Sequence, residues 1–354
     1  MRPVMLSQVA RWVEGRHLGA DVEITAVGTD GRTLAPGGLF VALRGEHHDG
    51  HDHVAQALER GAAALLVQRE VDCALPQVLC PDTQDALGEF AAGMQQGRPA
   101  VVVAITGSNG KTSVKTLLLG ILARAGKAYA NPGNFNNEIG LPLAVLNAPE
   151  DARFAIYEMG AGQPGDIAYL ASIAPPQVSL VNNVMPAHLE RMGSLLGVAE
   201  TKGAIYEALP DDGVAVVNAD DAFAPWFMQR IGARRVLRFG LENDADVRAS
   251  QLVAGADDSR FRLHTPAGEA TVALPLAEPN DFDSLLQRRR TCRNFDAGAT
   301  LAQDDFSAML RRVWGAMGTR TLAPGAVAVK KTSPAGGGLH AVEAYVLVRR
   351  VEGV

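Results

Sequence analysis

Cysteine is scarce in this sequence: only Cys73, Cys80 and Cys292 occur among 354 residues. An odd, scattered set of cysteines gives neither a disulfide framework nor the paired spacing of a zinc site. We therefore expect a reducing, cytoplasmic environment. Long apolar runs are also missing, which excludes a membrane span, and the amino-terminal residues lack the apolar core of a signal peptide.

An excess of positive charge is absent as well. Lys and Arg number 33 against 39 Asp and Glu, a formal net charge of −6, and no basic block stands out early in the chain. Nucleic acid is therefore not an expected partner. The hydrophobic content of 47% and the length are those of a globular protein with two or three domains, whose oligomeric state the sequence does not fix.

The most informative motif follows an apolar, β-branched run at 101–105. The run ends in Thr106-Gly107-Ser108-Asn109-Gly110-Lys111-Thr112-Ser113. Two glycines allow a tight turn whose N–H groups converge on one point, Lys111 supplies charge for phosphates, and Thr112 supplies a hydroxyl for Mg²⁺. The strict pattern is not met, because Ile105 stands where its first Gly belongs. A plain turn between strand and helix is the alternative, and the combination of strand, Gly-Lys-Thr and helix disfavours it.

Helical spacing begins at Lys111 and predicts a helix with one buried face, stopped near Gly126. The residues predicted to form that face are Val114, Leu117, Leu118, Ile121, Leu122 and Ala125.

Residues 1–97 are predicted to form a small α/β domain. Its predicted elements are helices at 6–14 and 85–95 and strands at 22–27, 39–43 and 62–67, with a further helix starting at Val54. A loop rich in His and Asp lies between two of them, with His47, His48, Asp49, His51, Asp52 and His53. The crowded residues lack helical ligand spacing, so an exposed polar loop is favoured over a metal site.

Residues 98–276 alternate strand and helix signals, which predicts an α/β fold with a P-loop-type, mostly parallel sheet and flanking helices. Ligands of such sheets bind beyond the carboxyl ends of the strands, where Lys111, Glu158 and His188 fall. Glu158 is either an oxygen ligand suited to Mg²⁺ or a strand-end carboxylate that faces solvent. His188 is a metal ligand, a hydrogen-bond donor or an ordinary loop residue, and composition alone makes Lys202 a surface lysine.

These motifs together resemble the Mur ligases of bacterial cell-wall synthesis. The resemblance covers about the first 276 residues, and it is carried by the following segments: Asp30-Gly31-Arg32, Asp49-Gly50-His51, the loop at 106–112, Asn134–Gly140, Glu158-Met159-Gly160, Asn183-Val184 with Ala187-His188-Leu189, and Ala199–Gly203. Within the family it is greatest to the branch that joins D-alanyl-D-alanine to a UDP-N-acetylmuramoyl-tripeptide. The resemblance implies that ATP first converts the peptide carboxylate to an acyl phosphate, which the amine then attacks.

The resemblance also implies residue roles. Lys111 would hold ATP phosphates, Thr112 and Glu158 would hold Mg²⁺, and His188 would support a second Mg²⁺. Lys202 would be a carbamylated lysine. The implied substrate contacts are Asp30 and Arg32 for the UDP-sugar, with Asn136 and Asn137 of the matched polar loop as further candidates.

The sequence departs from the family at three places. Gly31 replaces the usual Ser, Ala204 replaces the usual Glu, and beyond Leu276 neither the expected Gly-x-His-Asn segment nor the family's carboxyl-terminal domain follows. A nucleotide-binding protein without ligase activity is therefore the alternative function.

Residues 277–354 instead resemble the amino-terminal part of a nitroreductase-like flavoprotein of peptide maturation. By that pattern Arg289, Arg290 and Arg293 would contact an FMN phosphate, with Ser333–Gly337 near the flavin. Because the segment covers only part of such a fold, FMN is not expected as a cofactor, and a flavin-dependent oxidoreductase is the second alternative.

Overall fold

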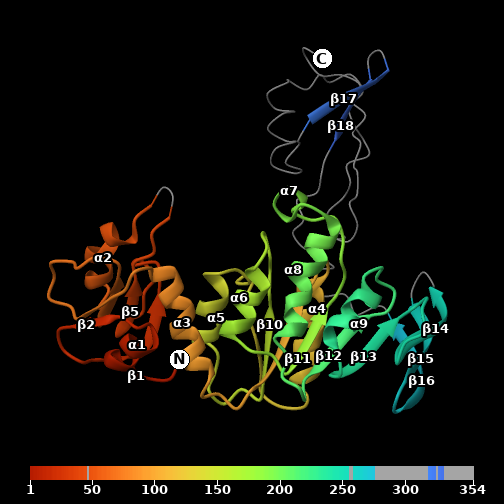
Figure 1. Ribbon diagram of the computed structural model, residues 1–354, viewed down its shortest axis with the longest axis horizontal. Coiled ribbons are helices and arrows are strands. Elements are labelled where there is room, and N and C mark those ends of the chain that lie inside the picture. The colour runs from red at the N-terminus through yellow and green to blue at the C-terminus, as the bar shows by residue number, and fades with distance from the viewer. Residues whose placement is uncertain (46–47, 255–257, 276–317, 324–325, 331–354) are drawn as a thin grey trace. The chain divides into compact units, whose positions relative to one another are not determined.

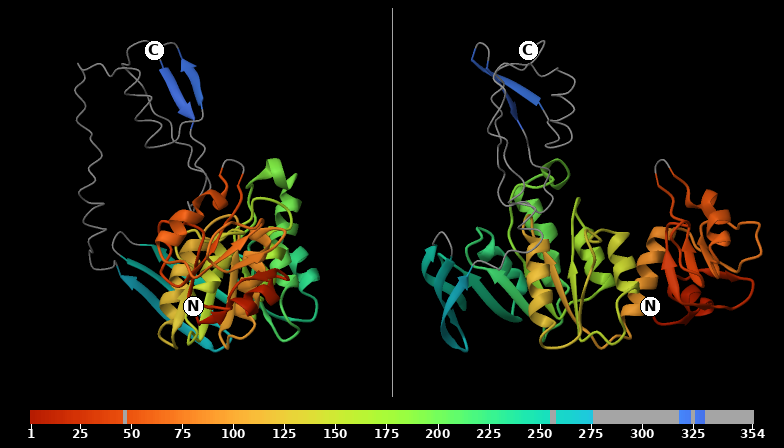
Figure 2. Two further views of the ribbon diagram at one scale, coloured as in Figure 1. Left: turned by 90° about the vertical axis from the view of Figure 1, so that its left-hand side faces the viewer. Right: turned by 180° about the vertical axis from the view of Figure 1, so that it is seen from behind.

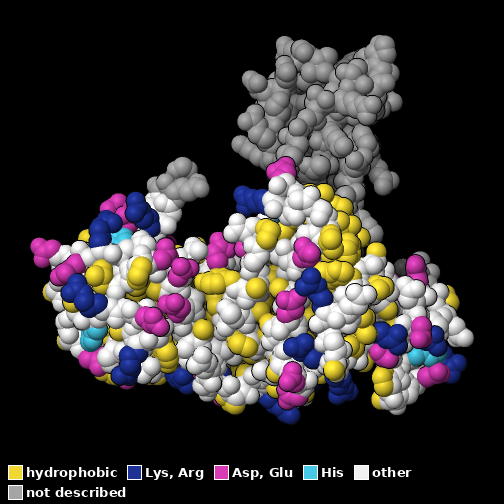
Figure 3. Space-filling model, viewed as in Figure 1, with side chains coloured by type: hydrophobic (Ala, Val, Ile, Leu, Met, Phe, Trp, Pro, Cys, Tyr) yellow, Lys and Arg dark blue, Asp and Glu magenta, His cyan; other side chains and the backbone are white. Residues whose placement is uncertain are grey.

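The computed structural model describes residues 1–45, 48–254, 258–275, 318–323 and 326–330 (Figure 1). The chain folds as two compact units, Met1–Ala245 and Asp246–Val354. On the face shown in Figure 3, acidic and basic side chains of the described residues are interspersed.

The amino-terminal part of the first unit is built on a five-stranded sheet of order β2-β7-β6-β5-β4. Its strands are β2 (Arg16–Leu18), β4 (Ala26–Gly28), β5 (Gly38–Val41), β6 (Ala64–Val67) and β7 (Gln77–Leu79), with β2 antiparallel to β7 and the other pairs parallel. The helices are α1 (Leu6–Trp12), a 3-10 turn (Gly50–His53), α2 (Val54–Glu59) and α3 (Thr83–Gln95).

The single strand predicted at 22–27 is wrong. It divides at Thr25 into β3 (Glu23–Ile24), which pairs with β1 (Val4–Met5), and β4, which pairs with β5. Two different partners over six residues require a change of direction that alternation of apolar residues does not reveal.

Six parallel strands form the centre of the first unit, in the order β13-β12-β11-β8-β10-β9. They are β8 (Val101–Thr106), β9 (Ala128–Ala130), β10 (Phe154–Glu158), β11 (Val178–Val181), β12 (Val214–Asn218) and β13 (Arg235–Gly240). This confirms the predicted parallel sheet. Because the chain moves from β10 to β11 across β8, the strand order reverses around β8, which is where such sheets bind ligands.

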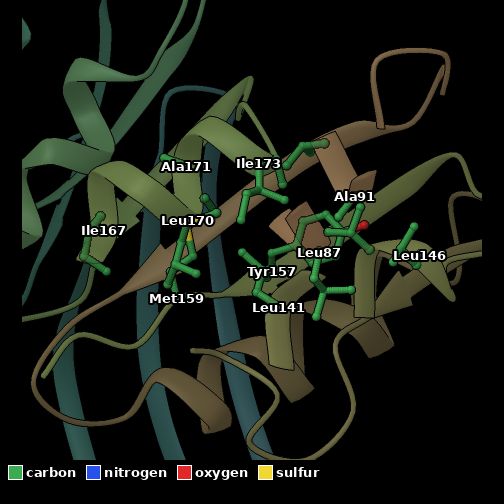
Figure 4. Packing of buried hydrophobic residues seen from close by; sticks show 14 of the residues in the cluster. Leu87, Ala91, Leu141, Leu146, Tyr157, Met159, Ile167, Leu170, Ala171 and Ile173 are labelled. Carbon is green, nitrogen blue, oxygen red and sulfur yellow. The ribbon is translucent and has the colours of Figure 1, made fainter. Parts of the chain in front are cut away.

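Helices cover both faces of these strands (Figures 1 and 2). They are α4 (Lys111–Leu122), α5 (Gly140–Leu146), α6 (Asp166–Ile173), α8 (Leu195–Glu207) and α9 (Ala224–Ile231). The short α7 (Leu189–Met192) contacts α8. Alternate residues of β8 point to opposite faces: Val102 and Ala104 join the large core with α3, α5, α6 and α8, while Val103 and Ile105 join a smaller core under α4. Figure 4 shows the large core, in which Leu87 of α3 lies with Leu141, Tyr157 and Leu170.

The predicted buried face of α4 is partly wrong. Leu117 and Ile121 are 69% and 65% exposed, whereas Leu119, which was not predicted, packs with Val114, Leu118 and Leu122 against the smaller core. The helix ends at Leu122, before Ala125, and Gly126 donates its N–H to the Leu122 carbonyl at 3.1 Å. The sheet therefore touches a stripe rotated from the one that the leucines alone suggest.

The second unit contains an antiparallel meander of β14 (Val247–Ala254), β15 (Asp258–Thr265) and β16 (Gly268–Pro275). It also contains the hairpin of β17 (Gly318–Ala323) and β18 (Ala326–Lys330). The predicted flavin contacts Arg289, Arg290 and Arg293 and the Ser333–Gly337 turn lie outside the described residues.

Candidate active site

The predicted phosphate loop connects β8 to α4. Gly110 caps α4 in the left-handed region, at φ 75°, and a Cβ there would lie 2.7 Å from Nδ2 of the Asn182 side chain. Only glycine meets both constraints without a shift of its neighbour. The 12-residue helix that follows aims its positive end at the loop, and a hollow of about 400 Å³ lined by Thr112, Ser113, Thr116 and Leu117 opens beside its first turns.

Lys111 folds back onto this loop. Its Nζ donates to the Gly107 carbonyl at 2.9 Å and, at 3.5 Å, to that of Ser108. Burial lowers the pKa of Lys111, and Glu158 acts in the opposite direction. The ammonium group therefore lies within the loop, where an anion would meet it.

The loop after β11 holds the phosphate loop in place. Asn109 N–H donates to Asn183 Oδ1 at 2.9 Å, and Asn182 Nδ2 donates to the Asn109 carbonyl at 2.8 Å. The Ser108 hydroxyl donates to the Met185 carbonyl and accepts from the Met185 N–H, both at 2.9 Å. Asn182 was not among the predicted site residues, although two polar residues directly after a buried strand were a usable signal.

Glu158 ends β10 and is 2% exposed. Its Oε2 accepts from the Thr112 hydroxyl at 2.9 Å and lies 3.1 Å from Lys115 Nζ, while Oε1 accepts from Asn136 Nδ2 at 2.8 Å. The alternative of a strand-end carboxylate facing solvent is therefore wrong. The structure brings Thr112, Glu158 and Asn136 together, and Asn137 Oδ1 instead accepts from Gly140 N–H at the start of α5.

Thr112 and Glu158 offer a suitable pair of oxygens for Mg²⁺. An octahedral ion with bonds of about 2.1 Å keeps neighbouring oxygen ligands roughly 3 Å apart, close to the observed 2.9 Å between Thr112 Oγ1 and Glu158 Oε2. No cluster of three or more His, Cys, Asp or Glu side chains suited to a metal occurs within the described residues. Water and phosphate oxygens are the usual remaining ligands of Mg²⁺.

His188 and Lys202 differ sharply in environment. His188 is exposed and takes the left-handed conformation at φ 51° before α7, a sparsely populated state for a non-glycine residue. Lys202, on α8, is 3% exposed, so its interpretation as a surface lysine is wrong. Burial, with a smaller contribution from Lys111, lowers the pKa of Lys202 to about 7.

Asp30 and Arg32 lie in the loop after β4. Arg32 Nε and Nη2 donate to the two Asp30 carboxylate oxygens at 2.9 and 2.8 Å, and these bonds lower the pKa of Asp30 to about 2. Gly31 between them is buried, and a Cβ there would lie 3.1 Å from the Ala57 nitrogen. A serine at this position would therefore require α2 to move by a few tenths of an ångström.

The His- and Asp-rich loop is not uniformly exposed, in contrast to the prediction. The His51 side chain is 1% exposed, accepts from Gln68 N–H at Nε2 (3.0 Å) and lies 2.5 Å from Asp49 Oδ1 at Nδ1. Because Nε2 accepts, Nδ1 carries the proton and donates to Asp49. Asp49 also accepts from Arg69 at 2.7 Å, which is the main reason that its pKa is well below the usual range.

Comparison with known proteins agrees with this arrangement. A model described as "Mur ligase middle domain" matches residues 105–278, and one described as "Mur ligase family, catalytic domain" matches residues 23–95. Together the two matches span well over half of the chain. The chain belongs to the Mur ligase family. The α/β fold and the family resemblance predicted from sequence are both confirmed.

Two similar proteins have the same name. The UDP-N-acetylmuramoyl-tripeptide–D-alanyl-D-alanine ligase of Escherichia coli is 42% identical over 302 residues, which are 85% of this chain and 66% of that enzyme. The ligase of the same name from Haemophilus influenzae is 37% identical over 83% of this chain and 65% of its own length. This Mur ligase chain thus spans slightly less than two thirds of both relatives.

Solved structures agree with the family. The crystal structure of MurF from Acinetobacter baumannii has a TM-score of 0.74 at 28% identity, covering 93% of this chain and 73% of that one. MurF ligase from Thermotoga maritima, in complex with ADP, has a TM-score of 0.65 at 32% identity, covering 70% and 57%. In the part of this Mur ligase that the structure describes, no helix combines the length and apolarity needed to cross a membrane.

Proposed function

We propose that this chain binds ATP and Mg²⁺ and acts in the ligation of D-alanyl-D-alanine to a UDP-N-acetylmuramoyl-tripeptide. The phosphate loop is the observation that carries the proposal. Its conformation is already fixed by Asn182 and Asn183, and it holds an ammonium group at the start of a helix. Groups that are fixed before the substrate arrives need no reorganisation when charge develops on a transferred phosphoryl group.

The proposed reaction has two steps. An oxygen of the terminal peptide carboxylate attacks the γ-phosphorus of ATP, and the bond from this phosphorus to the β,γ-bridging oxygen breaks. ADP leaves, and the peptide remains as an acyl phosphate. The amine of D-alanyl-D-alanine then attacks the acyl carbon. The bond between this carbon and the phosphate oxygen breaks, phosphate leaves with the electron pair, and the amine nitrogen loses a proton. In both steps the protein mainly positions the reactants and balances charge.

Lys111 would exchange its carbonyl partners for ATP phosphates. Its present acceptors, Gly107 and Ser108, are backbone oxygens of the loop itself, so an incoming anion offers a stronger, charge-assisted partner at the same place. Ser108 and Asn109 already donate their N–H groups to Asn183, so the main-chain N–H groups of Gly110 to Ser113 would share in this contact.

Thr112 and Glu158 would hold Mg²⁺, which when bound neutralises charge between the phosphates. The 2.9 Å spacing of their oxygens supports this assignment. His188 would approach a second Mg²⁺, and the left-handed backbone at this residue is the kind of strain found at functional sites.

Lys202 would carry a carbamate. The reaction joins the neutral amine to CO₂ and releases a proton, so it needs an amine that loses its proton near neutrality. The low exposure of Lys202 and its pKa of about 7 support this role. The carbamate would then bring negative charge near Lys111.

We assign the UDP-sugar to residues 1–97, with Asp30 and Arg32 as contacts, ATP to residues 98–276, and residues 277–354 to a third part. The family matches at 23–95 and 105–278 support the first boundary. Asn136 would act at the ATP site through its hydrogen bond to Glu158. A cytoplasmic location stays a prediction.

The decisive experiment separates nucleotide binding from ligation. ADP formation is measured with ATP alone, with each co-substrate and with both, and ATP binding is measured by calorimetry. We expect ADP formation only when both co-substrates are present, and loss of ATP binding in Lys111→Ala but not in Lys127→Ala, whose exposed side chain pairs with Asp151. Binding without ADP formation would instead identify a nucleotide-binding protein without ligase activity. Unchanged ATP binding by Lys111→Ala would contradict the proposal.

A further inference from the structure

The one fully buried residue of α4 is a lysine. Lys115 is 5% exposed, although Leu117 and Ile121 of the same helix lie in solvent. An amphipathic helix normally shows the reverse pattern, because removing an ammonium group from water is unfavourable unless partners replace the water. The placement of Lys115 therefore needs an explanation.

Lys115 has a complete set of partners. Its Nζ donates to the carbonyls of Asn131 and Gly133 at 3.0 and 2.9 Å and lies 3.1 Å from Glu158 Oε2. An ammonium group has three hydrogens to donate, so each has one acceptor. The three acceptors come from the loop after β9 and the end of β10, and Lys115 thus ties both to α4.

The same loop is bound to Glu158 a second time. Asn131 Oδ1 accepts from Glu158 N–H at 2.8 Å, and Asn131 Nδ2 donates to the Glu158 carbonyl at 3.0 Å. Asn131 is 2% exposed. Lys115, Asn131 and Glu158 therefore form a closed unit in which neither the backbone nor the carboxylate of Glu158 is free to turn.

We propose that Lys115 is a positioning residue for Mg²⁺-dependent nucleotide binding. It balances the buried charge of Glu158 and holds Oε2 beside the Thr112 hydroxyl, so the pair of Mg²⁺ oxygens is formed before the ion arrives. This inference rests on the proposed function, because it takes Thr112 and Glu158 as the Mg²⁺ ligands. A group that orients a metal ligand acts on metal affinity rather than on the nucleotide itself.

The test compares ADP binding with Mg²⁺ and with EDTA. Calorimetry on the full chain gives the ratio of the two affinities, which reports the contribution of Mg²⁺ alone. We expect Lys115→Met to keep the EDTA affinity and to lose about 10- to 100-fold of the Mg²⁺ enhancement. Lys127→Met is the matched control, since that lysine is exposed and should leave the ratio unchanged.

Lys115→Arg keeps the protein testable if Lys115→Met does not fold. A guanidinium retains the charge beside Glu158, but its planar fork cannot donate to the same three oxygens. The Mg²⁺ enhancement should fall in this variant too, with the unfolding midpoint maintained. An unchanged enhancement in either folded variant would overturn the inference, as would equal losses with Mg²⁺ and with EDTA. A parent chain that binds no ADP would instead overturn the proposed function.

Discussion

The hydroxyl of Thr112 donates to Glu158 Oε2 at 2.9 Å, although 46 positions separate the two residues in sequence. One residue lies in the first turn of the helix after β8, and the other ends the neighbouring strand β10. Parallel pairing of β8 and β10 thus places a hydroxyl and a buried carboxylate at the same edge of the sheet.

The Thr112 hydroxyl leads to the first prediction. In Thr112→Val the shape of the side chain is kept and one of the two proposed Mg²⁺ oxygens is lost, so ADP affinity in Mg²⁺ should fall by about tenfold or more. Affinity in EDTA should be unchanged. Thr112→Ser retains the hydroxyl and is the control. Calorimetric titrations in which valine and serine variants respond alike to Mg²⁺ would contradict a role for this oxygen.

Local signals predicted the parts of the site that are close in sequence. The run at 101–105, the glycines and Lys111-Thr112 follow one another directly, so strand, loop and helix were all predictable from the pattern. Two partners of the Glu158 carboxylate were not predicted as such. Lys115 and Asn136 lie 43 and 22 positions away from it, and only the folded sheet brings them to its carboxylate.

Burial of polar residues was the other failure of sequence reasoning. Periodicity assigned Leu117 and Ile121 to the core of α4 and gave no reason to bury Lys115, yet the structure does the opposite. Lys202 was likewise a surface lysine by composition, and only the family resemblance gave it a role. A charged side chain is buried where partners or chemistry require it, and neither is visible in a hydrophobic pattern.

The Asp49 carboxylate leads to a stability prediction. Asp49→Asn removes the negative charge that accepts from Arg69, His51 Nδ1 and His51 N–H, so we expect a loss of about 1 to 2 kcal/mol at neutral pH. The folded protein lowers the pKa of Asp49, so the ionised carboxylate stabilises the native state above the unfolded pKa of about 4. That advantage is lost as pH falls further.

Urea unfolding at neutral pH and at progressively lower pH measures this difference. Asp52→Asn is the control, because the Asp52 side chain is 73% exposed and lies 3.9 Å from Arg69. A gap between Asp49→Asn and the parent that stays constant on acidification would show that the charge of Asp49 does not stabilise this loop.

The buried amine of Lys202 leads to a prediction for a higher pH range. Its pKa falls from 10.5 in the unfolded chain to about 7 in the native one, mainly through burial and then through Lys111. Below pH 7 both states are protonated and the native state holds an unfavourable buried cation. Between pH 7 and 10.5 the unfolded state binds the extra proton, so native stability rises with pH.

Lys202→Met should therefore be more stable than the parent at pH 6 in CO₂-free buffer, by at least about 1.4 kcal/mol, the equivalent of one pKa unit. The difference in unfolding free energy between variant and parent should narrow at pH 9, and the proposed ligase activity should be lost at both pH values. Denaturant unfolding measures this difference, and Lys127→Met, with its exposed ion pair to Asp151, provides the control. Because other titrating groups are common to both proteins, they cancel in the difference. An equal difference in unfolding free energy at pH 6 and pH 9 would mean that the native fold does not lower the pKa of Lys202. Carbamate formation at this residue would then lose its physical basis.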